Sequence, residues 1–185
     1  MHRKYTLLIA TLIIFGLSMR LLPHPANFTP IGALALFGSL YLPRRWALIV
    51  PLGALLLSDA IIGFYSSKIM ISVYLSFALV GFIGLWVREH KSFTTVFGGT
   101  VLGSIFFFLI TNTAVWAFGT MYTLDFSGLM QSYYMALPFF RNSLLGDLFY
   151  TAVLVGVVEM VMWRRRLRVA HAEIIRVLYN TKKVL

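Results

Sequence analysis

The sequence contains no cysteine, and few of its residues carry a charge. Without cysteine, the chain forms no disulfide, no thiolate metal site and no cysteine nucleophile. Charged residues make up 12% of the 185 residues and hydrophobic ones 59%, whereas soluble domains have roughly 25% charged residues. Disordered chains are polar and highly charged, so this composition also excludes disorder. It predicts a small polytopic membrane protein.

Histidine is scarce too, and the chain has no glycine-rich phosphate loop. The histidines are His2, His24, His90 and His171, and no two of them have the spacing of metal ligands. Without a phosphate-binding loop, the chain is not expected to hydrolyse ATP by itself. We therefore expect no metal bound by the protein alone and no resident cofactor.

Six apolar segments are separated by basic or turn-forming residues. They lie at about 5–22, 31–42, 46–64, 69–87, 94–118 and 141–163. Five are long enough to cross a bilayer, which takes about 20 residues. The short second segment follows residues 23–30, whose three prolines exclude a continuous helix. We predict an all-α integral membrane protein with a six-helix transmembrane domain over 1–163 and a basic amphipathic cytoplasmic tail over 164–185.

The distribution of basic residues predicts the orientation. The net charge is +10, and with a cytoplasmic N-terminus, thirteen of the 16 Lys and Arg residues fall on the cytoplasmic side. This agrees with the positive-inside rule and places both termini in the cytoplasm. The long external connection, about 119–140, is rich in aromatic and apolar residues, so we expect a short helix there that covers the outer end of the bundle.

Strongly polar side chains gather in the half of the helices predicted to lie outside. A charged residue at mid-bilayer costs about 2.5–3.5 kcal/mol on insertion scales, so such residues usually serve a function. We interpret them as a polar, aromatic-lined ligand cavity open to the outside. The candidate ligand-binding residues are Arg20, His24, Asn27, Thr29, Asp59, Asn112, Trp116, Tyr133, Tyr134, Arg141, Asn142 and Asp147. The alternative is that Arg20, Asp59, Arg141 and Asp147 form two buried ion pairs that only fix helix register.

Four blocks of the sequence resemble an uncharacterised family of small bacterial membrane proteins. They begin with Arg20-Leu-Leu-Pro-His-Pro-Ala-Asn-Phe-Thr-Pro, and the later blocks are Leu57-Ser-Asp59, Thr111-Asn-Thr-Ala-Val-Trp116 and Ala136-Leu-Pro-Phe-Phe-Arg-Asn-Ser-Leu-Leu-Gly-Asp147. The layout is similar to the S-components of energy-coupling-factor vitamin transporters, which have six helices, cytoplasmic termini and an outer ligand cavity. The nearest functional relative is the solitary S-component-like family for vitamin B12.

That resemblance implies vitamin uptake. The sequence departs from the S-component pattern in two features. The vitamin B12 family is associated with a cysteine ligand to cobalt, which this sequence lacks, so His24 is the candidate axial ligand to a corrinoid cobalt. S-components that share an energising module also have a stripe of small residues on the first helix. The first helix here carries large aliphatic residues instead, which favours a solitary protein or a docking surface elsewhere.

We therefore expect a transporter or substrate-binding component for uptake of a vitamin-sized molecule, with cobalamin as the leading candidate. It would lie in the bacterial cytoplasmic (inner) membrane. Its partners would be the ligand, the lipid bilayer and, as a candidate, an ATPase coupling module; none would be a nucleic acid.

Two other classes of function remain open. One is a membrane enzyme with Asp59 or Asp147 as general base and His24 as acid, and the other is a structural or assembly subunit. In the transport interpretation, Arg141→Ala would lose ligand affinity.

Overall fold

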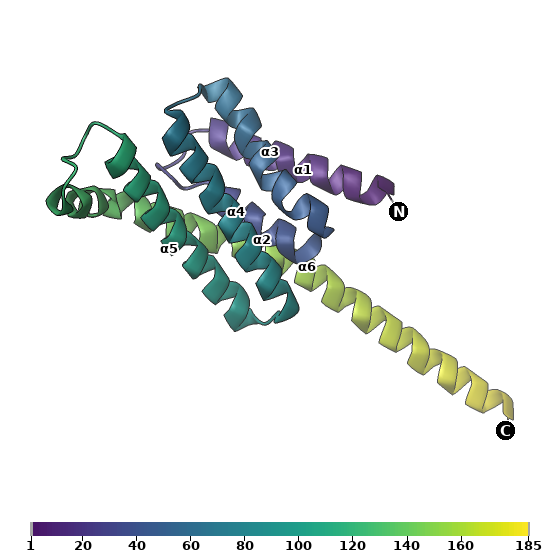
Figure 1. Ribbon diagram of the computed structural model, residues 1–185. Coiled ribbons are helices and arrows are strands. Elements are labelled where there is room, and N and C mark those ends of the chain that lie inside the picture. Colours follow the sequence, from purple (N-terminus) through teal and green to yellow (C-terminus); the bar gives the residue numbers. More distant parts are fainter. Residues whose placement is uncertain (1, 185) are drawn as a thin grey trace. The chain divides into compact units, whose positions relative to one another are not determined.

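The computed structural model describes the backbone of residues 2–184 and the side chains of residues 6–173. Within this range, the chain folds into six helices and no strand (Figure 1). The helices are α1 (His2–Leu21), α2 (Ile31–Tyr41), α3 (Arg44–Ile62), α4 (Ser67–Glu89), α5 (Phe93–Phe118) and α6 (Phe126–Val184). The chain divides into two units, Met1–Thr151 and Ala152–Leu185, and the second consists of the later part of α6. The predicted all-α class is confirmed.

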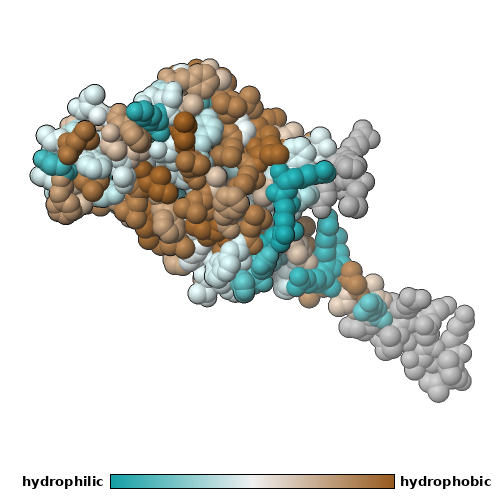
Figure 2. All heavy atoms as spheres, in the orientation of Figure 1, coloured by the Kyte–Doolittle hydropathy of each residue, from teal (hydrophilic) through white to brown (hydrophobic). Residues whose placement is uncertain are grey.

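Four helices are long and apolar enough to cross a membrane. They are α3, α4, α5 and the part of α6 that ends at Glu173, whereas α1 and α2 contribute shorter apolar stretches, Thr6–Leu21 and Ile31–Tyr41. Large hydrophobic side chains remain exposed along these helices, for example Ile61, Leu75 and Phe97. Figure 2 shows such side chains over much of the visible face of the first unit. Exposed apolar surface of this extent is expected where lipid is the solvent, so the chain is a multi-pass membrane protein.

The short helix α2 forms the core of the first unit. Its residues Ile31–Leu40 are all buried, and small residues let α4 approach it closely. A Cβ atom added at Gly84 would lie 3.1 Å from the carbonyl oxygen of Leu36, and the Ser39 hydroxyl donates a hydrogen bond of 2.7 Å to the Gly81 carbonyl. Small residues and interhelical hydrogen bonds are the usual means of helix association in membranes.

Both ends of α2 are capped by charged side chains from other helices. At its C-terminus, the Arg88 guanidinium of α4 donates to the carbonyl oxygens of Leu42 at 2.8 Å and Ser39 at 3.4 Å. At its N-terminus, the Asp147 carboxylate of α6 accepts a hydrogen bond from the backbone N–H of Ala33. A cation at the C-terminus and an anion at the N-terminus both complement the helix dipole. These contacts supply partners for the end groups of a buried half-length helix.

Helix α6 begins much earlier than the sequence analysis predicted. The carboxylate of Asp125 starts it by accepting hydrogen bonds from the Gly128 backbone N–H at 2.7 Å and the Thr123 hydroxyl at 3.0 Å. These two bonds lower the pKa of the Asp125 carboxyl. The structure thus has one continuous helix in place of the predicted break near residue 141, and this helix continues into the predicted tail from 164.

Pro138 lies inside α6 and does not end it, because a proline removes only one backbone donor and membrane helices tolerate this loss. The remaining five predicted segments lie within a few residues of α1–α5. The side chains from residue 174 onward, in the predicted amphipathic tail, lie outside the described residues.

Candidate ligand-binding site

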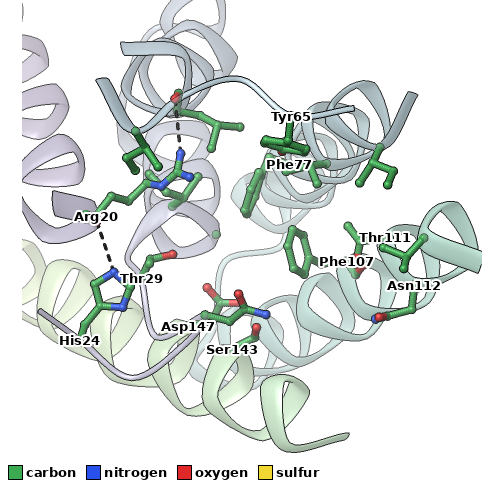
Figure 3. A pocket seen from close by; sticks show the side chains of 18 residues that line it. Arg20, His24, Thr29, Tyr65, Phe77, Phe107, Thr111, Asn112, Ser143 and Asp147 are labelled. Atoms are coloured by element: carbon green, nitrogen blue, oxygen red, sulfur yellow. Dashed lines mark hydrogen bonds between the residues drawn. The ribbon is translucent and has the colours of Figure 1, made fainter. Parts of the chain in front are cut away.

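A cavity of about 460 Å³ opens in the first unit, among the ends of its helices. Its lining comes from the C-terminal ends of α1, α3 and α5, the N-terminal ends of α2 and α4, the segment between α1 and α2, and α6. Six candidate residues named from the sequence line it: Arg20, His24, Asn27, Thr29, Asn112 and Asp147 (Figure 3). Residues more than 100 positions apart in the sequence thus meet in one space.

Arg20 is fixed at one side of the cavity by a buried ion pair. Its Nη1 atom lies 2.9 Å from Oδ1 of Asp59 and also donates to the Ser58 hydroxyl at 2.6 Å and the Leu55 carbonyl at 3.3 Å. Asp59 is 1% exposed, and its Oδ2 accepts a hydrogen bond of 2.9 Å from the Tyr74 hydroxyl. Asp59 therefore lies behind Arg20 and holds it, instead of lining the cavity itself.

Asp147 lies across the cavity from the aromatic wall, and Figure 3 shows its carboxylate pointing into the open space. Its Oδ2 accepts a hydrogen bond of 2.7 Å from the Ser104 hydroxyl of α5. The carboxylate also touches the first turn of α2, where a Cβ atom added at Gly32 would overlap it. Only glycine at position 32 leaves room for this approach, so the carboxylate is positioned by both α2 and α5.

The proline-rich segment forms a turn over the cavity. The Phe28 N–H donates to the Pro25 carbonyl at 2.9 Å, and Asn27 adopts a φ of 63°. Asparagine tolerates this left-handed conformation better than most residues. The amide of Asn142 on α6 donates to the Ala26 carbonyl at 3.0 Å. Asn142 therefore braces the turn, whereas Asn27 lines the cavity.

His24 lies in the same segment and is bonded to backbone. Its Nδ1 is 2.8 Å from the Pro25 carbonyl oxygen and its Nε2 is 3.4 Å from that of Arg20. Among the residues whose side chains are described, no group of three or more His, Asp or Glu side chains is arranged to hold a metal ion.

Four other candidate residues do not line the cavity. The Trp116 indole N–H donates to the Thr123 carbonyl at 2.9 Å, and the Tyr133 hydroxyl lies 2.7 Å from that of Thr113. Tyr134 is 72% exposed, and Arg141 is exposed as well. Trp116 and Tyr133 thus connect α5 to the beginning of α6.

The cavity has an aromatic wall that the sequence analysis did not identify. It consists of Phe77 on α4, Phe107 on α5 and Tyr65 between α3 and α4. The rings of Phe77 and Phe107 are 4.8 Å apart. Burial, followed by the nearby Asp59 charge, raises the pKa of the Tyr65 hydroxyl. The spacing of Phe107, Thr111 and Val115 at i, i+4 and i+8 puts them on one helix face, a signal that could have indicated this wall beside Asn112.

Of the two structural ion pairs in the alternative interpretation, one is present. Arg20 and Asp59 pair as that alternative requires, but Asp147 bonds to Ser104. A further ion pair joins Arg44 and Glu89, which are both exposed. Ser143, one turn before Asp147 on α6, also lines the cavity.

The comparisons with known proteins identify a family without an assigned activity. Residues 1–171 match the model of the "Family of unknown function (DUF6580)". Because the match covers most of the chain, the protein belongs to this family. No curated protein and no solved structure matches the chain.

Proposed function

We propose that this member of the DUF6580 family is a membrane-embedded transporter or substrate-binding component for the uptake of a vitamin-sized molecule. The observation that carries the proposal is the cavity of about 460 Å³. Small-molecule sites usually measure about 300–1,000 Å³ and combine apolar walls with a few directed polar groups. Here the walls are aliphatic and aromatic, and Arg20, Asn112 and Asp147 supply the directed groups.

The basic residues support a cavity that opens outward from a bacterial cytoplasmic membrane. The helix ends opposite the cavity carry a cluster of basic side chains, namely Arg44, Arg45, Arg88 and Lys91. Cytoplasmic loops are enriched in Lys and Arg. This orientation puts the N-terminus in the cytoplasm. In an S-component-like bundle of six helices, α1 and α2 would be the two helices besides the four long apolar ones.

The size of the cavity favours a ligand smaller than a corrinoid. Cavities of this volume enclose drug-sized molecules, and cobalamin is considerably larger. Binding cobalamin would require the turn at residues 25–28 to move away, and His24 would then be the candidate ligand to its cobalt. Cobalamin is therefore not the best fit for the cavity, although the resemblance to the vitamin B12 family makes it the first compound to test.

Purification with a retained ligand tests the proposal. The protein is expressed in rich medium supplemented with cobalamin, purified in mild detergent, and examined by visible spectroscopy and native mass spectrometry. We expect one small molecule per chain. In Val73→Trp, the indole would project into the cavity and ligand retention should fall, whereas Leu75→Trp, two residues along α4 at an exposed position, should retain the ligand.

Two results would contradict the proposal. Conversion of the ligand to a product during incubation would favour an enzyme, and stoichiometric co-purification of another membrane protein with an empty cavity would favour an assembly subunit. Co-purification of an ATPase together with the ligand would instead identify the energising module of a transporter.

A further inference from the structure

Asp147 is the uncompensated charge of the cavity. In the part of the chain whose side chains are described, no Lys, Arg or His lies within ion-pair distance of its carboxylate. Its two hydrogen-bond donors, the Ser104 hydroxyl and the Ala33 N–H, are neutral. The cation that lines the same cavity, Arg20, is already paired with Asp59. When it is ionised, Asp147 therefore gives the cavity a net negative charge.

Burial makes an unpaired charge on Asp147 costly, whereas its hydrogen-bond donors and the N-terminus of α2 stabilise the ionised carboxylate. Hydrogen bonds donated to a carboxylate stabilise its charged form, and the N-terminus of α2 adds the positive end of a helix dipole. A carboxylate has about four acceptor positions. The two protein bonds leave acceptor capacity, and the carboxylate points into the cavity (Figure 3).

The same geometry works against a negatively charged ligand group at this position. A helix N-terminus would ordinarily attract an anion, but here the carboxylate of Asp147 already lies against the first turn of α2, in contact with Gly32. An anionic ligand group placed there would meet a like charge.

The aromatic wall is complementary to a positive charge. The Phe77 and Phe107 rings both line the cavity, with their centroids 4.8 Å apart and their planes inclined by 33°. The faces of aromatic rings carry partial negative charge and attract cations, more strongly when water is excluded. The rings also supply apolar area for the rest of the ligand.

We infer that the cavity binds an organic cation whose positive nitrogen pairs with Asp147 while its apolar body packs on Phe77 and Phe107. The inference rests on the proposed function, because it names the chemical class of the molecule that the cavity takes up. An ammonium or a quaternary aromatic nitrogen on a vitamin-sized molecule has the required chemistry.

A pair of matched compounds tests the inference. Benzyltrimethylammonium is compared with neopentylbenzene, which has the same shape with carbon in place of the charged nitrogen. Binding to the purified protein in detergent is measured by isothermal titration calorimetry. We expect the wild type to bind the cation about 10- to 100-fold more tightly than the neutral compound, because the quaternary nitrogen donates no hydrogen bond but gains a cation–π contact and the attraction of a nearby carboxylate.

The variant Asp147→Asn separates charge from helix capping. Asparagine also caps helix N-termini, so the variant should keep its helix content and melting temperature while its preference for the cation disappears. The control variant Asp125→Asn removes the same formal charge at an exposed position outside the cavity. It should bind both compounds like the wild type. If Asp147→Asn unfolds, the preference of the wild type for the cation decides the question.

The possible results distinguish failure of the cation inference from failure of the proposed function. Equal binding of both compounds by the wild type, or an unchanged preference in folded Asp147→Asn, would overturn the inference and leave the binding function intact. Recovery of a neutral or anionic ligand by native mass spectrometry would do the same. If neither compound binds and no ligand is recovered, the proposed function fails together with the inference.

Discussion

The ion pair between Arg20 and Asp59 predicts a large loss of stability when Arg20 alone is removed. Asp59 is 1% exposed, and its partners are the Arg20 guanidinium at 2.9 Å and the Tyr74 hydroxyl at 2.9 Å. Arg20→Ala leaves a buried carboxylate with one neutral donor. Removing one member of a buried ion pair costs about 3–5 kcal/mol, mostly because the remaining charge is uncompensated. We expect a loss of free energy of unfolding in that range.

Two further variants separate the charge from the packing. In Asp59→Asn, the amide oxygen still accepts a hydrogen bond, so the expected loss is about 1.5–3 kcal/mol, the usual contribution of a hydrogen bond to a charged group. In the double variant Arg20→Met/Asp59→Leu, no buried charge remains. Replacing a buried pair with apolar residues of similar volume is often neutral or stabilising, so the double variant should be more stable than Arg20→Ala.

The assay is unfolding by sodium dodecyl sulfate in mixed dodecyl maltoside micelles, followed by circular dichroism. Arg44→Ala is the matched control, because the side chains of Arg44 and Glu89 are 74% and 59% exposed and an exposed pair is worth about 0–1 kcal/mol. If Arg20→Ala is no more destabilising than Arg44→Ala, or if the double variant is the least stable of the series, the reasoning from burial is wrong.

Three more predictions address the contact at α2, the cavity boundary and the orientation. Gly32→Ala places a methyl group on the Asp147 carboxylate, so we expect a loss of about 1–3 kcal/mol from overpacking in the same unfolding assay, together with weaker ligand retention; unchanged stability would refute the contact. Arg141→Ala changes an exposed residue outside the cavity, so stability should change by no more than about 0.5 kcal/mol and native mass spectrometry should find ligand retention unchanged, contrary to the expectation from sequence; loss of the ligand would place Arg141 in the site. Because the chain has no cysteine, Ser66→Cys and His90→Cys can each be labelled selectively in whole cells with a membrane-impermeant maleimide; only Ser66→Cys should react, and the reverse result would invert the proposed orientation.

Helix α6 shows where reasoning from sequence stopped. Pro138 and the turn-forming residues between 119 and 140 suggested a loop with a short helix, but the structure has one helix from Phe126. The Asp125 cap was a local signal that could have been recognised, because aspartate is a preferred N-cap residue. Continuity past Pro138 was harder to predict, because the effect of a proline depends on whether neighbouring helices and side chains satisfy the freed backbone group.

For the candidate site too, some features could be predicted from the sequence and others could not. Hydropathy and the cost of charge in lipid place Arg20, Asn112 and Asp147 toward the same predicted side of the membrane. They do not show that Asp59 lies behind Arg20, nor that Phe77 and Phe107 form the aromatic wall in place of Trp116, Tyr133 and Tyr134. Those relations depend on how each helix is rotated about its axis against its neighbours.

Reading the residues alone was therefore enough to predict the membrane class, the approximate extent of the first five helices and the gathering of polar residues toward one end. These properties follow from composition and from spacing within single segments. The tertiary structure alone decided which polar groups meet, and above all that the carboxylate of Asp147 caps α2 while facing the cavity without a counter-ion. The physical reason is that helix periodicity specifies the faces of one helix, whereas the close approach at Gly32 and the bond to Ser104 depend on the packing of three helices at once.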